Sequence, residues 1–310
     1  MFDIITIGEI LIDLTQTGIN EQGIPEYASN PGGAPANLAV AAAKLGAKTA
    51  FMGKVGNDSF GSYLKECLIS NGVDTKGVVT DSVLHTTLAV VSVDKTGERS
   101  FSFYRDPGAD VNLTKEDIDL KLLTDTKFFH FGSVSLTTDP ARSTTLYAVK
   151  KAKEAGACIS YDPNFRPSLW SNEKEAIRQM TEPLSLVDVI KVSEEELPLL
   201  TGTVDAEKGS QILMQKGISL ILVTLGEKGA FYRLGTHTGH VPGVPCKVAD
   251  TNGAGDTFFG AVLAGLSKTE KLQEISTAEL ERIIAIANKA ASITTSRHGA
   301  IPAMPTKEEL

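Results

Sequence analysis

Residues 250–256 read Asp-Thr-Asn-Gly-Ala-Gly-Asp and run directly into an apolar helical stretch. The small residues Gly253, Ala254 and Gly255 allow backbone N–H groups to approach an anion closely, and a helix start adds partial positive charge at the same point. Asp256 falls in the first helical turn, where a carboxylate can take the proton of an attacking hydroxyl. The segment predicts a phosphate cradle beside a general base, a combination suited to phosphoryl transfer to an alcohol.

Taken alone, this segment is equally compatible with a helix that begins on a favourable carboxylate. A second segment, residues 30–37, has paired glycines, Gly32 and Gly33, before an Ala-rich helix. Asn37 in that helix offers a donor and an acceptor of the kind that recognise vicinal hydroxyls. Asp13 follows the first predicted strand, where its carboxylate can bind two sugar hydroxyls. The alternative for residues 30–37 is an ordinary glycine turn.

These side chains must be positioned by a repeating pattern of strands and helices. Short apolar runs typical of strands lie at residues 3–8, 48–55, 127–132, 157–162, 188–192 and 220–225. Helical patterns separate them, and this alternation predicts a mainly parallel sheet covered by helices on both faces. In such sheets, ligands bind beyond the carboxyl ends of the strands.

Two segments interrupt the alternation. Residues 11–33 are rich in Thr, Gly and Asn, and residues 86–110 hold two β runs, 87–93 and 99–105, around a turn at 94–97. We interpret them as a small β-sheet lid over the cleft. The chain is therefore predicted to be a single domain, residues 1–310, with a lid.

Composition excludes several other classes of protein. The 310 residues are 42% hydrophobic and 22% charged, as in folded globular proteins. With 38 Asp and Glu against 30 Lys and Arg, the net charge of −8 has the wrong sign for nucleic-acid binding. No apolar run reaches the roughly 18 residues of a membrane span, and residues 1–5 lack the basic start of a signal peptide, so we expect a cytoplasmic protein. The three cysteines are expected to be reduced core residues.

The chain contains neither a P-loop nor a Gly-x-Gly-x-x-Gly after its first strand, so the phosphate site must be of another kind. Together, residues 30–37 and 250–256 resemble the two signatures of the ribokinase or pfkB family of carbohydrate kinases. Both stand in the family's order and at about its spacing, and the resemblance covers the whole chain. It implies a ribokinase-like three-layer α/β/α sandwich with a β lid, and phosphorylation of a sugar hydroxyl by ATP.

The resemblance also implies roles for individual residues. Asp256 matches the general base, residues 253–255 match the anion hole, and the sugar-contacting positions are Asp13, Gly32, Gly33 and Asn37. The segment Lys191, Val192, Ser193 and Glu194 to Glu196 is similar to the family's Asn-x-x-Glu element, in which the glutamate organises Mg²⁺ and its waters. Ser193 replaces the asparagine, which weakens the role of that position and leaves Glu196 available. A solvated helix start is the alternative for this acidic run.

The nucleotide site is implied by three further matches. Thr224, Gly226 and Gly229 resemble the family's nucleotide loop, and Asn288 resembles part of its adenine pocket. Asp250, with residues 292–299, resembles a loop that holds a monovalent cation such as K⁺. These roles rest on the resemblance alone.

Three stretches, residues 30–37, 104–110 and 161–170, resemble the corresponding elements of fructokinases. Arg166 suits ATP phosphates or the moving phosphoryl group, Arg105 on the lid suits substrate oxygens, and Asn164 suits phosphate or a magnesium-bound water. Either arginine pairing with a local carboxylate is the alternative. Fructose is the expected acceptor. Another acceptor such as 2-keto-3-deoxygluconate, ribose or a nucleoside, a non-catalytic sugar sensor, and a homodimer formed through the lid remain open.

Overall fold

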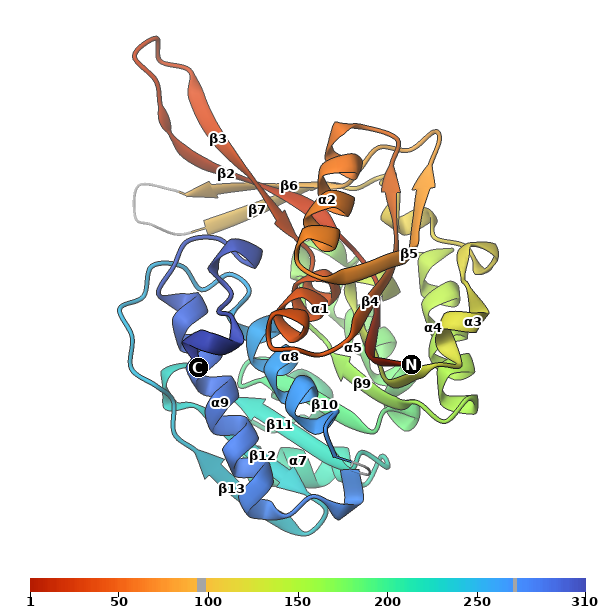
Figure 1. Ribbon diagram of the computed structural model, residues 1–310, viewed down its shortest axis with the longest axis vertical. Coiled ribbons are helices and arrows are strands. Elements are labelled where there is room, and N and C mark those ends of the chain that lie inside the picture. The colour runs from red at the N-terminus through yellow and green to blue at the C-terminus, as the bar shows by residue number, and fades with distance from the viewer. Residues whose placement is uncertain (94–98, 270–271) are drawn as a thin grey trace.

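The computed structural model describes residues 1–93, 99–269 and 272–310, and a nine-stranded sheet forms the centre of this described part (Figure 1). Its order is β13-β12-β11-β10-β9-β8-β1-β4-β5. The strands are β1 Phe2–Ile7, β4 Thr49–Gly56, β5 Val73–Asp81, β8 Thr126–Gly132, β9 Cys158–Asp162, β10 Val189–Ser193, β11 Leu220–Thr224, β12 Ala230–Leu234 and β13 His237–Val241. All neighbours from β5 to β11 are parallel, and β11 to β13 pair antiparallel. The predicted mainly parallel sheet is confirmed.

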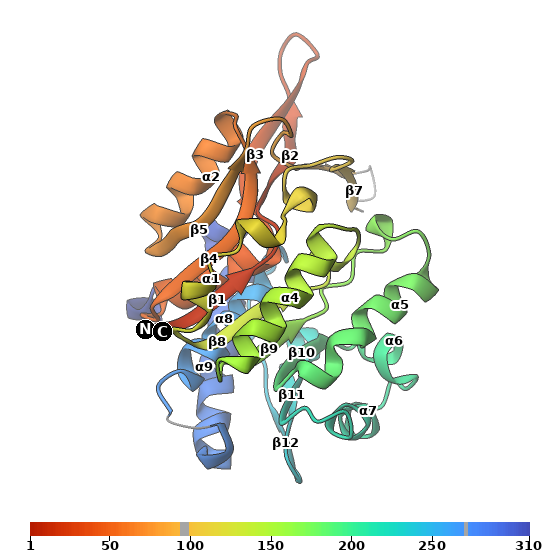
Figure 2. The ribbon, with the colours of Figure 1, turned by 90° about the vertical axis from the view of Figure 1, so that its right-hand side faces the viewer.

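Helices cover both faces of this sheet (Figure 2). In β1, Ile5 and Ile7 pack into one hydrophobic cluster and Ile4 into another, because alternate side chains of a strand point to opposite faces. One face carries α1 Ala34–Lys44, α2 Ser59–Ser70, α8 Ala254–Leu266 and α9 Thr277–Thr295; the other carries α3 Leu120–Leu123, α4 Ala141–Glu154, α5 Glu173–Thr181, α6 Leu197–Thr201 and α7 Ala206–Met214. The three-layer sandwich is thereby confirmed. Within the described ranges, no helix combines the length and apolarity that crossing a membrane requires.

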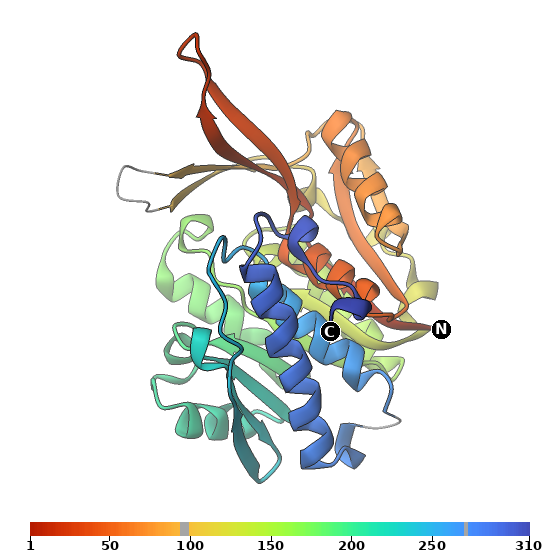
Figure 3. The ribbon, with the colours of Figure 1, turned by 60° about the vertical axis from the view of Figure 1, so that its left-hand side comes forward.

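A second, smaller sheet projects from the body (Figures 1 and 3). It contains β2 Leu11–Ile19, β3 Pro25–Gly32, β6 Leu88–Val93 and β7 Arg99–Tyr104, in the order β3-β2-β6-β7. The outer pairs are antiparallel, and β2 and β6 are parallel. These strands fall in the two segments predicted to form the lid, whereas the predicted turn at 94–97 lies outside the described residues.

The cysteines are less buried than the sequence suggested. Cys67 and Cys158 are half-buried, and Cys246 is exposed. The prediction of a core position is wrong for Cys246, because the connection from β13 to α8 runs over the surface instead of through the interior.

Helices α1 and α8 pack unusually closely. Helix α1 is built largely of alanines, and Ala41 faces Gly260 of α8. A Cβ on Gly260 would lie 2.8 Å from the Leu38 carbonyl oxygen and 2.9 Å from the Ala41 Cβ. Because protein interiors are close-packed, the absence of a side chain at Gly260 sets the separation of the two helices.

We expect Gly260→Ala to lower the free energy of unfolding by about 1–3 kcal/mol, since the added methyl group must push the α1 backbone away. Urea denaturation of both proteins measures the effect. Gly18→Ala is the matched control, because a Cβ there meets nothing within 4 Å. Equal losses in the two variants would contradict the assignment of the helix spacing to Gly260.

Candidate active site

Two cavities flank the start of α8 at the carboxyl ends of the parallel strands. The smaller, of about 50 Å³, is lined by polar residues that include Asp13, Asn37 and Asp256. The larger, of about 570 Å³, is lined on its α8 side by Ala254 and Gly255. The predicted base and the predicted anion hole therefore open on two adjoining spaces, which is the arrangement that transfer between two substrates requires.

Asp256 lies in the first turn of α8. This helix begins directly after Gly253, whose φ of 75° places it in the left-handed region. Asp256 Oδ2 accepts a hydrogen bond from Asn37 Nδ2 at 2.8 Å. Burial raises the pKa of Asp256, while the hydrogen bond from Asn37 and the charges of Lys191 and Arg166 oppose the rise. A carboxylate made more basic in this way is suited to accept a proton.

The sugar-binding residues predicted from the sequence come together around the smaller cavity. Asp13 Oδ2 accepts a hydrogen bond from Asn252 Nδ2 at 3.4 Å, and burial raises the pKa of Asp13 to about 6. Asn37 Oδ1 is buried and has no hydrogen-bond partner among the described residues. Gly33 lines the cavity, and a side chain on Gly32 would collide with the Asp13 carboxylate. The site thus presents several acceptors to a polyhydroxylated ligand.

The two arginines have different surroundings. Arg166 lines the smaller cavity with Asn164, and its Nη1 donates a hydrogen bond to the Phe165 carbonyl at 3.2 Å. Its charge lowers the pKa of both Asp13 and Asp256. Of the two predicted arginines, Arg166 is therefore the one brought to the reacting groups.

Arg105 is buried at the root of the lid, and the described residues that line the two cavities do not include it. It donates to Asp110 at 2.7 Å, to Thr137 at 2.8 Å and to the Val134 carbonyl at 3.0 Å. The guanidinium is thus held by partners within the protein, and the predicted contact of Arg105 with substrate oxygens stays a prediction.

Most of the predicted nucleotide residues line the larger cavity. Those that do so are Ser193, Thr224, Gly226, Gly229, Gly255 and Asn288, together with Ala254 of the predicted anion hole. Asn164 lines the smaller cavity instead, and Lys191, Glu196 and Gly253 are not among the described residues that line either cavity. Sequence reasoning missed its apolar wall, formed in part by Val244, Pro245, Val248 and Phe258. The sequence carried a signal for this wall, because valines and prolines occur with glycine in a loop that has no sheet or helix pattern. In the structure, Val244 and Val248 are exposed.

Asn288 shapes this cavity through the backbone. Its Nδ2 donates to the carbonyls of Val241, at 3.1 Å, and Pro242, at 2.9 Å. Both bonds fix the loop that follows β13 and use the two hydrogens of the amide nitrogen.

A buried ion pair supports the α8 start from below. Lys191 Nζ donates to Asp162 Oδ2 at 2.8 Å, and a Cβ on Gly255 would lie 3.2 Å from the same nitrogen. Burial lowers the pKa of Lys191, but the carboxylates of Asp162, Glu196 and Asp256 together hold it above its ordinary value. The lysine is therefore a fixed positive charge directly beneath the predicted anion hole.

Glu196 holds two loops together. Its Oε1 accepts the Phe165 N–H at 2.7 Å and its Oε2 accepts the Ser193 N–H at 2.9 Å. No group of three or more His, Cys, Asp or Glu side chains in the described ranges is arranged to hold a metal ion directly. The role of Glu196 toward Mg²⁺ through water stays a prediction.

Asp250 fastens the loop before α8 to the segment after α9. Its Oδ1 accepts the Asn252 N–H at 2.9 Å and its Oδ2 accepts the Gly299 N–H at 3.1 Å. The predicted cation loop is thus brought together in space, with the carboxylate bridging its two halves.

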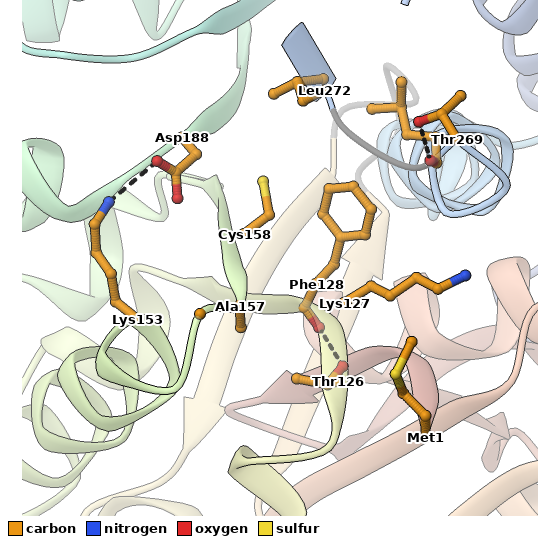
Figure 4. A pocket seen from close by; sticks show the side chains of 12 residues that line it. Met1, Thr126, Lys127, Phe128, Lys153, Ala157, Cys158, Asp188, Thr269 and Leu272 are labelled. Carbon is orange, nitrogen blue, oxygen red and sulfur yellow. Dashed lines mark hydrogen bonds and ion pairs between the residues drawn. The ribbon is translucent and has the colours of Figure 1, made fainter. Parts of the chain in front are cut away.

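A third cavity, of about 540 Å³, lies at the opposite edge of the sheet, by the amino ends of β8 and β9 (Figure 4). Lys127 donates to the Ser267 carbonyl at 2.6 Å and pairs with Asp3, and Lys153 pairs with Asp188 at 3.1 Å. None of the site residues predicted from the sequence lines this space, and its lysines already have partners.

Known proteins with a similar sequence or structure include several fructokinases. Probable fructokinase-4 of Arabidopsis thaliana is 43% identical over 99% of this chain and 95% of its own length. Fructokinase with bound ATP from Xylella fastidiosa has a TM-score of 0.93 at 35% identity, covering 100% of this chain and 97% of its own. A fructokinase double mutant from Vibrio cholerae O395 with fructose, ADP and potassium ion bound has a TM-score of 0.88 at 37% identity, covering 98% and 96%.

The family model of pfkB family carbohydrate kinases matches residues 1–307, so the match includes the lid, both cavities and the helix start between them. The predicted family is therefore confirmed over almost the full sequence. The chain belongs to the pfkB family of carbohydrate kinases.

Proposed function

We propose that the chain is a fructokinase that transfers the terminal phosphoryl group of ATP to the 6-hydroxyl of D-fructose, giving ADP and D-fructose 6-phosphate. The observation that carries this proposal is the α8 start between two cavities, with Asp256 lining the smaller and Gly255 the larger. A hydroxyl in the first space and a phosphate in the second meet at this point. The similarity to fructokinases supports fructose as the acceptor.

In this proposal the smaller cavity holds the sugar. The carboxylates of Asp13 and Asp256 accept hydrogen bonds from sugar hydroxyls, and the unpartnered Asn37 Oδ1 accepts another. The hydrogen bond from Asn37 to Asp256 fixes the base toward the hydroxyl to be phosphorylated. Because a buried polar atom without a partner is costly, the unpartnered oxygen favours a ligand rich in hydroxyl groups.

The larger cavity holds ATP. Its apolar wall, including Val244 and Val248, suits the adenine ring, and Thr224, Gly226 and Gly229 lie where ribose and phosphates would pass. The terminal phosphate would point at the amides of Ala254 and Gly255.

Phosphoryl transfer then depends on charge and position. Asp256 removes the proton of the 6-hydroxyl as that oxygen attacks phosphorus, and the bond to the ADP oxygen breaks. The amides at the α8 start, Lys191 beneath them and Arg166 from the sugar side stabilise the negative charge of the moving group. Positioning of the two reactants supplies much of the remaining acceleration.

ATP is used as its magnesium complex, and the metal reduces the negative charge of the phosphates. Glu196 and Asn164 are the residues we propose to hold waters of that complex. Support comes from the donor chemistry: Glu196 is a carboxylate held rigidly by two backbone N–H groups, beside the loop that carries Asn164. For a monovalent cation, K⁺ in particular, we propose the loop bridged by Asp250.

The lid would exclude water, which otherwise competes as phosphoryl acceptor. Its strands also carry exposed apolar side chains, among them Ile19, Tyr27 and Tyr104. Exposed apolar surface on a projecting sheet supports a second proposal, a homodimer contact through the lid.

We expect fructose to give the highest kcat/KM in a coupled ADP-release assay, at least about tenfold above 2-keto-3-deoxygluconate, ribose, mannose and adenosine. Arg166 in the sugar cavity is a cation that suits a carboxylate, so 2-keto-3-deoxygluconate is the second candidate. A higher kcat/KM for 2-keto-3-deoxygluconate than for fructose would make it the acceptor in place of fructose. A chain that turns over none of the five would be a sugar sensor and would contradict the kinase assignment.

We expect Asp256→Asn to lower kcat by on the order of 100-fold or more, because the amide cannot accept the hydroxyl proton. Binding of a non-hydrolysable ATP analogue should change less than about threefold, because the anion hole is made by backbone. Asp106→Asn, at an exposed carboxylate of the lid root, is the control with normal turnover. Near-normal kcat in Asp256→Asn would refute the base assignment.

We expect kcat/KM for fructose to fall about tenfold for each pH unit below about 6. Asp13 and Asp256 serve as carboxylates, and burial raises the pKa of Asp13 to about 6 and raises that of Asp256 as well. The two carboxylates are therefore present above these pKa values and are lost as the pH falls through them. A rate profile at constant ionic strength from pH 8 to pH 5 measures this; a flat profile would show that neither carboxylate titrates there.

A further inference from the structure

Glu9 is a buried carboxyl that the mechanism above does not use. It lies between β1 and β2, where the chain first crosses from the body to the lid, and its residue is 3% exposed. Its Oε1 accepts the N–H of Ala34 at 3.0 Å, and Ala34 is the first residue of α1, just after the chain returns from the lid. The Glu9 side chain thus links the two points, at Glu9 and Ala34, where the chain passes between the body and the lid.

The second oxygen of this carboxyl is unsatisfied. Oε2 of Glu9 is buried and has no hydrogen-bond partner among the described residues, and Glu9 lines the same cavity as Asp13 and Asp256. Leaving a buried polar atom unpaired costs roughly 1–3 kcal/mol. An orphan oxygen beside a cavity built for a polyol is explained when the polyol itself is the missing partner.

The charged groups near Glu9 give Oε2 no donor. Arg105 and Asp110, from the segment after β7, are hydrogen-bonded to each other at 2.7 Å, and Arg105 also donates to Thr137 and to the Val134 carbonyl. Burial raises the pKa of Glu9 to about 7; the backbone N–H groups of Glu9 itself and Ala34 and the charge of Arg105 oppose the rise, and Asp110 adds to it. The raised pKa favours the protonated carboxyl, and Oε2 has no hydrogen-bond partner among the described residues.

We propose that Glu9 is a sugar-contacting residue: its protonated carboxyl donates from Oε2 to a hydroxyl oxygen of the bound sugar while Oε1 keeps its bond to Ala34. This inference rests on the proposed function, because it takes the smaller cavity to be the sugar site. Asp13 and Asp256 in that cavity are acceptors, and a hydroxyl group both donates and accepts. A donor on the Glu9 side complements them and selects for a hydroxyl at that place.

Two substitutions separate this contact from simple support of the lid crossing. Glu9→Gln keeps an acceptor for Ala34 and places a permanent donor where the protonated oxygen stood. Glu9→Met keeps the length and removes both bonds. We would measure the Kd of fructose by calorimetry with a non-hydrolysable ATP analogue present, at pH 6 and pH 8. Glu26→Gln, at an exposed lid carboxyl, is the control.

We expect the wild-type Kd for fructose to rise from pH 6 to pH 8 by roughly tenfold more than that of Glu9→Gln, because only the wild type loses its donor on titration. Asp13 and Asp256 remain in both proteins, so their titration cancels in the ratio, as does the fixed charge of Arg166. Glu9→Met should weaken fructose binding about tenfold or more at both pH values and leave the affinity for the ATP analogue unchanged.

Parallel pH dependence in the wild type and Glu9→Gln would overturn the proposal, as would wild-type fructose affinity in Glu9→Met. If Glu9→Met does not fold, the comparison with Glu9→Gln decides alone. Fructose binding without turnover in the wild type would refute the kinase function and leave the role of Glu9 decided by the same titrations. If the wild-type chain binds no fructose, both the proposed function and the proposed role of Glu9 are overturned. A wild-type titration that shows no heat of binding identifies this case.

Discussion

The separation of α1 and α8 is the constraint on which the candidate site depends. Asn37 and Asp256 are 219 positions apart in the sequence, yet their side chains share a 2.8 Å hydrogen bond because the two helices that carry them nearly touch. That approach requires Gly260, whose position leaves no room for a Cβ against the α1 backbone. A small residue deep in a helix interface therefore sets the direction of the proposed base, and the conformational cost of a helical glycine is offset by that contact.

Charged side chains of both signs surround the start of α8. The buried carboxyls of Asp13, Asp162 and Asp256 each have a raised pKa, with burial as the largest cause, while Lys191 and Arg166 hold those pKa values down. Lys191 lies beneath the helix start and Arg166 lines the smaller cavity, so a positive charge lies on each side of the place where a phosphoryl group would pass. Asp162 keeps Lys191 in position through its 2.8 Å ion pair, so this charge is in place before any substrate arrives.

The sequence predicted the main sheet, the lid segments and the helix start at Gly253 because these depend on local patterns: apolar runs, glycine turns and a first-turn carboxylate. It gave pairing with a local carboxylate as the alternative for Arg105, and Asp110 is such a partner, but it did not predict Thr137, which follows β8 and is reached only in the folded chain. Asn288 was predicted at the nucleotide site and lines the larger cavity, but its two bonds to the loop after β13 depend on the packing of α9. Residue type indicated which side chains belong to the site, whereas the partner that occupies each polar atom required coordinates.

Glu9 escaped sequence reasoning for a related reason. A glutamate beside a strand is ordinarily solvated, and nothing in residues 8–13 indicates that this one is enclosed. Its burial follows from the lid: the chain leaves the body at Glu9 and returns at Ala34, and the two crossings close over the side chain. Asp13 and Gly33 lie on the same two crossings and line the same cavity. Since the residues that would hold the sugar are the ones that join the lid to the body, any movement of the lid changes the sugar site directly, and sugar binding must in turn bias the position of the lid.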